Sequence, residues 1–368
     1  MHTTLNLKRP VLAERLSLVS DRVKGIFMLL VVADHNDWFR QLAPHLFAPL
    51  TFHVLGFFFL TFSFGSKAWS GRFVADRVAR YLVPFWWALA GASLVFGVLY
   101  RGGSSPFERV SYFLQAALMG NANDVKASSG LLMLWFLPCL FGLTCLLAFY
   151  DSLASLVARR VALFLAVSAH VLSPFFVGAW MLRIPFGLAV AADMFVLGLI
   201  LRQLLKQRWH RYWSVIALVG LIASYGALVY LRTHIEIGTL EITELRNSWL
   251  LLLHDVSVLS AMLVVIAAAE YISVMHWLEG VGKNSLLVYL MHPIVYLMLS
   301  KIWVSPVQPG LTNVMLGLHA CVTTVIAISM AYGLSLLVSG SPTVSAWITP
   351  KSWHQWPPAQ RMGYGNYR

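Results

Sequence analysis

Apolar runs of about twenty residues follow one another along most of the chain, and this pattern constrains the fold more than any other feature. At about 1.5 Å per residue, a helix of that length crosses a bilayer core roughly 30 Å thick. Because lipid offers no partner for backbone polar groups, such spans are helices. The pattern therefore predicts an all-α protein, a polytopic membrane helical bundle with about ten transmembrane helices.

Short connections separate the expected spans and leave no room for an independent soluble domain. Only 11% of the residues are charged, against about a quarter in a typical soluble domain. We expect one integral-membrane domain over 1–340 and a short C-terminal tail over 341–368. The stretch 107–119 is expected to form an interfacial or re-entrant helix. The expected spans lie near 24–43, 48–66, 81–100, 131–150, 161–180, 184–201, 213–231, 248–270, 285–304 and 313–336.

Most lysine and arginine residues fall in the loops on one side of this topology. In a soluble protein, a formal net charge of +12 would suggest nucleic-acid binding. Here the positive-inside rule explains the charge, so no nucleic-acid partner is expected. The same rule predicts that both termini, and with them the C-terminal tail, lie in the cytoplasm.

The three cysteines, Cys139, Cys145 and Cys321, each fall in an apolar run. Their spacing does not match that of metal ligands. They are expected to be small core residues, and the sequence predicts no metal site.

The first apolar run holds a histidine at an unusual depth. Ten residues separate Lys24 from His35, which places the imidazole about 16 Å beyond the ammonium on a helix. With Lys24 at the membrane surface, His35 would lie near mid-bilayer, where ionisable residues are costly and are kept for function. Histidine serves as a general base near neutral pH, and Asp34 or Asp37 would orient its ring. The alternative is a solvated loop, which is favoured for Asp37 itself.

A basic cluster precedes the third expected span. Arg77 and Arg80 are three residues apart and would share a helix face, with Arg72 nearby. Two adjacent guanidinium groups suit a polyphosphate ligand, because their forked donors bind phosphate oxygens. Anchoring of the cytoplasmic end by the positive-inside rule also explains the pair, and it is the favoured explanation when the pair is considered alone.

A polar helix face is expected late in the chain. Gly282 and Asn284 fit a turn, and Ser285 fits the N-cap of the helix that follows. Ser285, Tyr289 and His292 recur at intervals of four and three residues, so they line one face of that helix. Such a face indicates either a cavity or polar contacts between helices.

Together these motifs resemble the acyltransferase-3 family of integral-membrane acyltransferases. One departure is Ser63-Phe-Gly65, where the family usually has Ser-Gly at the end of the second span. The resemblance is closest to the exopolysaccharide and fucose O-acetylase-like branch. The matching motifs are Lys24 and His35 in the first span, Phe-His-x-x-x-Phe-Phe-Phe at 52–59, the Arg77–Arg80 pair, Trp135-Phe-Leu-Pro138, and Gly-Lys-Asn-Ser-Leu followed by His292.

This resemblance implies an enzyme of the bacterial cytoplasmic (inner) membrane. Members without a fused hydrolase-like domain O-acetylate sugars of surface or secreted polysaccharides, or their lipid-linked precursors, from cytoplasmic acetyl-CoA. Transfer would be direct or through an acetyl-histidine. The implied site has His35 with Asp34 or Asp37 for catalysis, Lys24, Arg72, Arg77 and Arg80 for the acetyl-CoA phosphates, and His53, Asn284, Ser285, Tyr289 and His292 along the substrate cavity.

Two other classes of protein fit part of the pattern. A secondary transporter or flippase for a glycolipid or small polar substrate would also have about ten helices and intramembrane histidine and aspartate. It would predict paired helix breaks in two related halves, and the sequence shows no such duplication. A purely structural membrane subunit is disfavoured by the number of ionisable groups inside the apolar runs.

Overall fold

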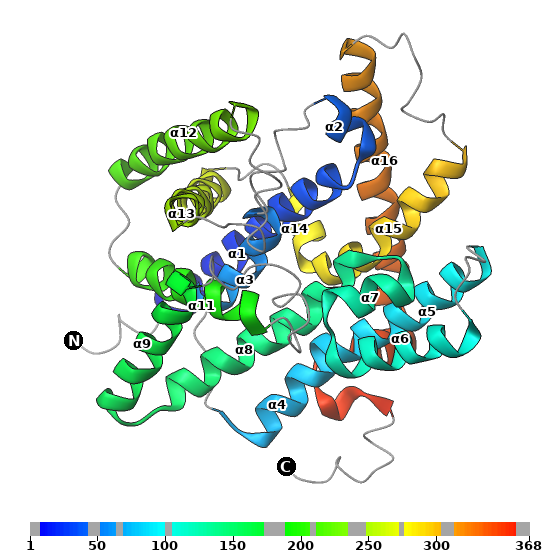
Figure 1. Cartoon of the computed structure of the whole chain (residues 1–368), viewed down its shortest axis with the longest axis horizontal. Coiled ribbons are helices and arrows are strands. Elements are labelled where there is room, and N and C mark those ends of the chain that lie inside the picture. The colour runs from blue at the N-terminus through cyan, green and yellow to red at the C-terminus, as the bar shows by residue number, and fades with distance from the viewer. Residues whose placement is uncertain are drawn as a thin grey trace. The chain divides into compact units, whose positions relative to one another are not determined.

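The computed structural model describes residues 8–42, 52–63, 69–99, 105–172, 188–206, 211–234, 248–271, 276–302 and 313–357. Within these ranges the chain is built from helices and short connections, with no strand (Figure 1). This confirms the predicted all-α class for the described part of the chain. The ends of several expected spans, among them 173–180, lie outside the described residues.

Each expected apolar run is largely helical over its described residues, although the first run is divided into two helices at His35 and Asn36. The long helices are α1 (Lys8–Asp34), α3 (Phe52–Ser63), α5 (Val83–Leu99), α6 (Pro106–Met119), α8 (Phe136–Ser152), α9 (Leu156–Leu172), α11 (Leu188–Lys206), α12 (Arg211–His234), α13 (Ser248–Tyr271), α15 (Ser285–Ile302) and α16 (Asn313–Gly340). Shorter helices lie between or after them. These are α2 (Asp37–Leu42), α4 (Gly71–Arg77), η1 (Val78–Leu82), α7 (Ala122–Ser129), η2 (Leu132–Trp135), α14 (His276–Lys283), α17 (Pro342–Ile348) and η6 (Trp353–Gln355).

Five helical segments of the described chain are long and apolar enough to cross a membrane. They are Gly71–Val95, Met133–Ser152, Ser214–Leu231, Leu250–Glu270 and Asn313–Gly340. Two shorter apolar segments accompany them, Met194–Leu205 and Ser285–Tyr296. The chain is therefore a multi-pass membrane protein, whereas the count of ten spans and the side of each terminus stay predictions.

The chain divides into two compact units whose segments alternate along the sequence. The first unit comprises 1–60, 207–241 and 252–336. The second comprises 61–206, 242–251 and 337–368. The end of the chain thus belongs to the same compact unit as the helix that carries Arg77 and Arg80.

In the first unit, α1 and α14 approach each other at two glycines. A Cβ atom on Gly25 of α1 would overlap the carbonyl oxygen of Leu278, and one on Gly282 of α14 would overlap that of Asp21. Small residues permit such close approach of helix backbones. The sequence-based prediction that Gly282 lies in a turn is wrong, because 276–283 is helical and the turn falls at Asn284.

An ion pair joins the same two helices. The Arg22 Nε and Nη2 atoms each lie 2.8 Å from Glu279 Oε1, and Arg22 Nη1 donates to the Ala269 carbonyl at 3.3 Å. Both charged side chains are largely shielded from solvent. The hydrogen bond from Arg22 lowers the pKa of Glu279 below its ordinary value.

This lowered pKa predicts an acid-sensitive contact between α1 and α14. Because the carboxylate is favoured in the folded state, its contribution to stability is present above the unfolded-state pKa of about 4.3 and is lost as pH falls through the lower folded-state pKa. Glu279→Gln should lower the free energy of unfolding by about 1–3 kcal/mol at neutral pH. The loss of stability on acidification should also be smaller in this variant than in the wild type.

Thermal unfolding in detergent between pH 3 and pH 7 measures this contribution. The exposed Glu270 at the end of α13 supplies the control, Glu270→Gln, which should leave the pH profile close to that of the wild type. Equal profiles for Glu279→Gln and the wild type would contradict the role of the ion pair.

The second unit is organised around α8, much of which is buried. Arg202 of α11 binds both carboxylate oxygens of Asp151 at the end of α8, at 2.9 and 3.0 Å. Gly198 allows α11 to approach the ring of Phe62. The segment Gly71–Leu99, which contains α4, η1 and α5, also contacts α8.

Candidate functional site

His35 lies where the first helix stops. The α1 helix ends at Asp34, His35 forms a turn, and α2 begins at Asp37. The prediction of one continuous helix over 24–43 is therefore wrong, because the helix is interrupted at His35 and Asn36. The cause is Asn36, whose side chain accepts a hydrogen bond from the Trp38 backbone N–H at 3.0 Å and so caps α2.

Asn36 also ties this break to α16. Its buried amide nitrogen lies 2.7 and 2.8 Å from the hydroxyl oxygens of Thr323 and Thr324, and 3.0 Å from the Ala320 carbonyl. Thr323 in turn donates to the His319 carbonyl at 2.6 Å. The position of His35 is thus set by a polar contact between helices that are distant in sequence.

The His35 ring meets a second histidine, His292 of α15. The two ring centroids lie 5.2 Å apart in an edge-on arrangement. His292 is fully buried, and its Nε2 atom has no hydrogen-bond partner within the described residues. An orphaned buried nitrogen is uncommon in folded proteins and marks a position where a ligand can bond.

The backbone determines which nitrogen of each ring can act as a base. Nδ1 of His35 lies 2.7 Å from the Val31 carbonyl, and Nδ1 of His292 lies 3.3 Å from the Val288 carbonyl. Because a carbonyl oxygen only accepts, Nδ1 carries the hydrogen in each bond, and Nε2 carries the lone pair. Both rings are therefore held in the tautomer that leaves the lone pair on Nε2.

Two tyrosines of α15 complete the cluster. The rings of Tyr289 and Tyr296 lie 5.7 and 6.4 Å from that of His292. The Tyr296 hydroxyl donates to the Val32 carbonyl at 2.7 Å, which attaches α15 to the end of α1. Sequence reasoning named Tyr289 but missed Tyr296 and Asn36. The only local signal for Tyr296 was its position four residues after His292.

The other residues expected around His35 have varied surroundings. Asp34 is half-buried and Asp37 is exposed, and the orienting contact on His35 Nδ1 is the Val31 carbonyl. The aspartates therefore stay predictions as orienting groups. Lys24 pairs with Asp21, with its Nζ 2.9 Å from Oδ1, so a phosphate there would share the ammonium with a carboxylate.

The remaining expected cavity residues are only partly described. Asn284 donates its side-chain N–H to the Gly280 carbonyl at 3.0 Å, and Ser285 begins α15 and is half-buried. His53 lies in α3, but its side chain is outside the described residues. Across the parts of the chain that are described, no three His, Cys, Asp or Glu side chains gather as metal ligands would.

The arginine pair lies on an irregular helix. Val78–Leu82 forms a π-helix, in which the Val83 N–H bonds to the Val78 carbonyl five residues back. Pro84 follows directly, and a proline ring in a regular helix clashes with the carbonyl four residues before it. The wider turn accommodates this ring. Such π turns are frequent at functional sites.

The wider turn separates the two arginines. Arg80 is exposed, and its guanidinium lies 5.8 Å from the Tyr81 ring centroid. Arg77 is half-buried, with its guanidinium 4.8 Å from the Phe73 ring centroid and its Nε atom buried without a described partner. The expected regular helix is corrected to a π turn, with Arg80 exposed and Arg77 half-buried. Arg72 is exposed on α4.

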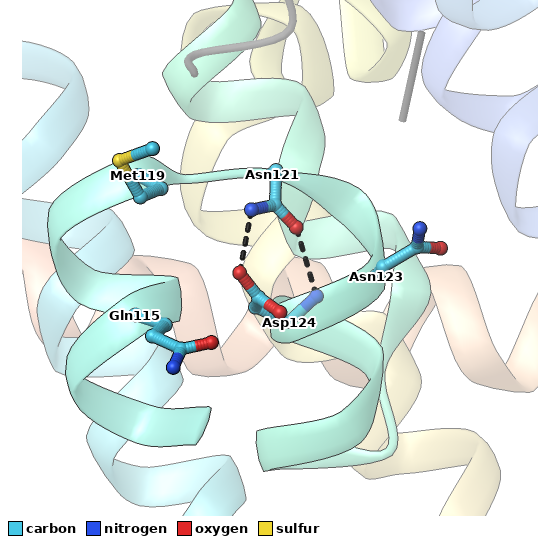
Figure 2. Close-up of a pocket in the computed structure, with 5 residues that line it drawn as sticks. All are labelled: Gln115, Met119, Asn121, Asn123 and Asp124. Atoms are coloured by element: carbon cyan, nitrogen blue, oxygen red, sulfur yellow. Dashed lines mark hydrogen bonds between the residues drawn. The ribbon is translucent and has the colours of Figure 1, made fainter. Parts of the chain in front are cut away.

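An open pocket of about 570 Å³ lies between α6 and α7 in the second unit. Figure 2 shows Asn121 and Asp124 facing each other across two hydrogen bonds. Asn121 donates to Asp124 Oδ2 at 2.5 Å and accepts from the Asp124 backbone N–H at 2.9 Å. These bonds cap α7, so a structural role accounts for the two residues. Gln115, Met119 and Asn123 complete the lining.

Comparison with known proteins assigns the chain to a family. A family model described as an acyltransferase domain matches residues 20–338, which include α1, the arginine pair and α15. No curated protein matches the chain, and no solved structure matches it. Members of the matched family are acyltransferases. Because the match covers most of the chain, this multi-pass membrane protein belongs to the acyltransferase-3 family and is an O-acyltransferase.

Proposed function

We propose that this acyltransferase moves an acetyl group from cytoplasmic acetyl-CoA to a sugar hydroxyl of a surface or secreted polysaccharide, or of its lipid-linked precursor. The carrying observation is the His35–His292 pair, with ring centroids 5.2 Å apart and the Nδ1 atom of each ring bonded to a backbone carbonyl. Acyl transfer to a hydroxyl needs a neutral base, and a fixed Nε2 lone pair supplies one. The enzyme would act in a bacterial cytoplasmic membrane.

His35 acts as the general base in this mechanism. Its Nε2 takes the proton of the sugar hydroxyl while the oxygen forms a bond to the thioester carbonyl carbon. The tetrahedral intermediate then breaks its C–S bond, and the imidazolium returns the proton to the leaving thiolate. The products are the acetyl ester and CoA, and the ring is again neutral. A route through an acetyl-histidine gives the same products.

His292 suits the recognition of the acceptor. Its Nε2 is a buried acceptor without a partner in the described chain, and a sugar offers several hydroxyl donors. A hydroxyl next to the reacting one could donate to this nitrogen and so orient the ring of the sugar. Ser285, Asn284 and Tyr289 are proposed to assist at the developing oxyanion, and His53 to line the cavity.

The proposed donor site is the arginine pair, with Arg72 on the same helical segment. Guanidinium groups bind phosphate oxygens through paired N–H donors. Acetyl-CoA should therefore stabilise the purified protein and raise its melting temperature. At a hundredfold excess over the dissociation constant, the free energy of unfolding should increase by about 2.7 kcal/mol. In Arg77→Ala/Arg80→Ala this stabilisation should largely disappear.

A matched control removes a different exposed cation, Arg160 of α9, and Arg160→Ala should keep the full response to acetyl-CoA. A transporter or flippase would instead be stabilised by its glycolipid or polar substrate and not by acetyl-CoA. Equal stabilisation of the double variant and the wild type would reduce Arg77 and Arg80 to membrane anchors.

A further inference from the structure

The last described segment of the chain folds back along the helix that carries the arginine pair. Trp347 of α17 accepts a hydrogen bond from Trp87 Nε1 of α5 at 2.9 Å. The backbone N–H of Trp353 in η6 donates to Asp76 Oδ1 of α4 at 3.0 Å. Since the order of contacts is reversed along the two segments, residues 341–357 run antiparallel to the helical segment 71–99.

This segment places a pair of tryptophans on the helical segment that carries the arginine pair. The rings of Trp353 and Trp356 lie 5.1 Å apart with an interplanar angle of 55°. The η6 turn packs on α4 and η1, which carry Arg77 and Arg80. An aromatic pair beside guanidinium groups combines a surface for a flat base with donors for phosphate.

Two hydrogen-bond donors in this region are unused. The Nε atom of Arg77 and the Nε1 atom of Trp356 are both buried and have no partner within the described residues. Tryptophan at a membrane interface usually keeps its N–H in contact with water or lipid headgroups. A buried, unused indole N–H is not explained by such anchoring, and it marks a place where an acceptor atom can bind.

The local charge favours an anion. Arg72, Arg80 and Lys351 are exposed cations of the two segments. The nearby carboxylate, Asp76, already accepts the Trp353 N–H. A ligand with several phosphates would therefore meet an excess of positive charge.

We propose that the C-terminal segment 341–357 is part of the donor site, and that Trp353 and Trp356 bind the adenine of acyl-CoA while Arg77 and Arg80 bind its phosphates. This inference rests on the proposed function, because it needs acyl-CoA as the donor. The segment then acts as the nucleotide-recognition element of the enzyme. Binding of the pantetheine arm of the donor does not involve residues 341–357.

Two acyl donors distinguish a nucleotide-binding role of this segment from a purely structural role. Acetyl-CoA carries the adenine and phosphates, whereas S-acetyl-pantetheine carries only the thioester and its arm. Trp356→Ala should weaken acetyl-CoA binding about tenfold or more, as expected for the loss of one base-stacking ring. The rate of thiol release from S-acetyl-pantetheine should change less than twofold. Trp277 of α14 is 47% exposed, and Trp277→Ala is the control that should change neither quantity.

A second measurement uses the wild-type chain and does not depend on whether a variant folds. Acetyl-CoA should slow amide hydrogen exchange in residues 341–357, and S-acetyl-pantetheine should not. Unchanged acetyl-CoA affinity in Trp356→Ala, or equal exchange with and without acetyl-CoA, would overturn the inference while leaving the proposed function intact. A folded wild type that binds no acetyl-CoA would overturn the proposed function, and the inference with it.

Discussion

Replacement of His35 by alanine is expected to lower the rate of acetyl transfer by about 10²–10⁴-fold, the contribution of a positioned general base. His35 lies at the break between α1 and α2 with Nδ1 bonded to the Val31 carbonyl, so its Nε2 holds the lone pair that takes the hydroxyl proton. The His292 ring is not expected to take over as the base, because its own backbone bond fixes it on a different helix. The measurement is release of the CoA thiol by purified protein in the presence of acceptor.

The loss must come from chemistry rather than from unfolding. The His35 side chain contributes little to the Asn36 contacts that hold the break against α16, so His35→Ala should fold. Its melting temperature should stay within a few degrees of the wild type, and acetyl-CoA should still stabilise it. A folded variant that retains more than a tenth of the wild-type rate would exclude His35 as the base.

Replacement of Gly282 by alanine is expected to destabilise the first unit by ~3 kcal/mol or more, the upper end of the range typical of an overpacked core. The added Cβ would overlap the Asp21 carbonyl oxygen and come close to the Gly25 nitrogen. Both atoms belong to the α1 backbone, which cannot move aside as the end of a flexible side chain can. The helix would have to shift and carry His35 with it.

Gly333 of α16 provides a matched control, because a Cβ there meets no atom within 4 Å. Gly333→Ala should be neutral or slightly stabilising, since alanine favours a helix over glycine. Melting temperature and the monodisperse fraction in detergent measure both variants. Equal stability of Gly282→Ala and Gly333→Ala would show that α1 and α14 do not pack through this glycine.

The sequence was sufficient for the positions of the helices but not for their interruptions. Apolar runs of membrane length predicted helices that the structure describes, from α5 to α16. The break at His35 had one local signal, because Asn36 is a residue type favoured at helix N-caps. The sequence could not predict the bonds from Asn36 to Thr323 and Thr324, which lie 287 and 288 residues later. No local pattern contains that contact.

The irregular turn before the third span had a local signal that was overlooked. Pro84 lies within an otherwise helical run, and a proline there conflicts with the carbonyl of Arg80. The π-helix over Val78–Leu82 relieves this conflict. A regular helix was assumed, so the arginines were expected on one face.

The candidate site was predicted residue by residue, but its assembly was not. His35 and His292 were each singled out for their position in an apolar run, while their contact joins helices that are far apart in the chain. The C-terminal segment was expected to be a short tail. Its contacts with Asp76 and Trp87 depend on tertiary structure that no sequence period reveals.

The central claim is that the enzyme, with His35 as the general base, transfers an acetyl group from acetyl-CoA to a glycan hydroxyl. The direct measurement supplies purified protein in liposomes with acetyl-CoA labelled in the acetyl group, and with surface glycan from a strain that lacks the protein. The account predicts labelled glycan and equimolar CoA thiol with the wild type, and both products about 10²–10⁴-fold more slowly with His35→Ala. A folded, acetyl-CoA-binding wild type that labels no glycan, or a His35→Ala variant that labels it as fast as the wild type, would contradict the account.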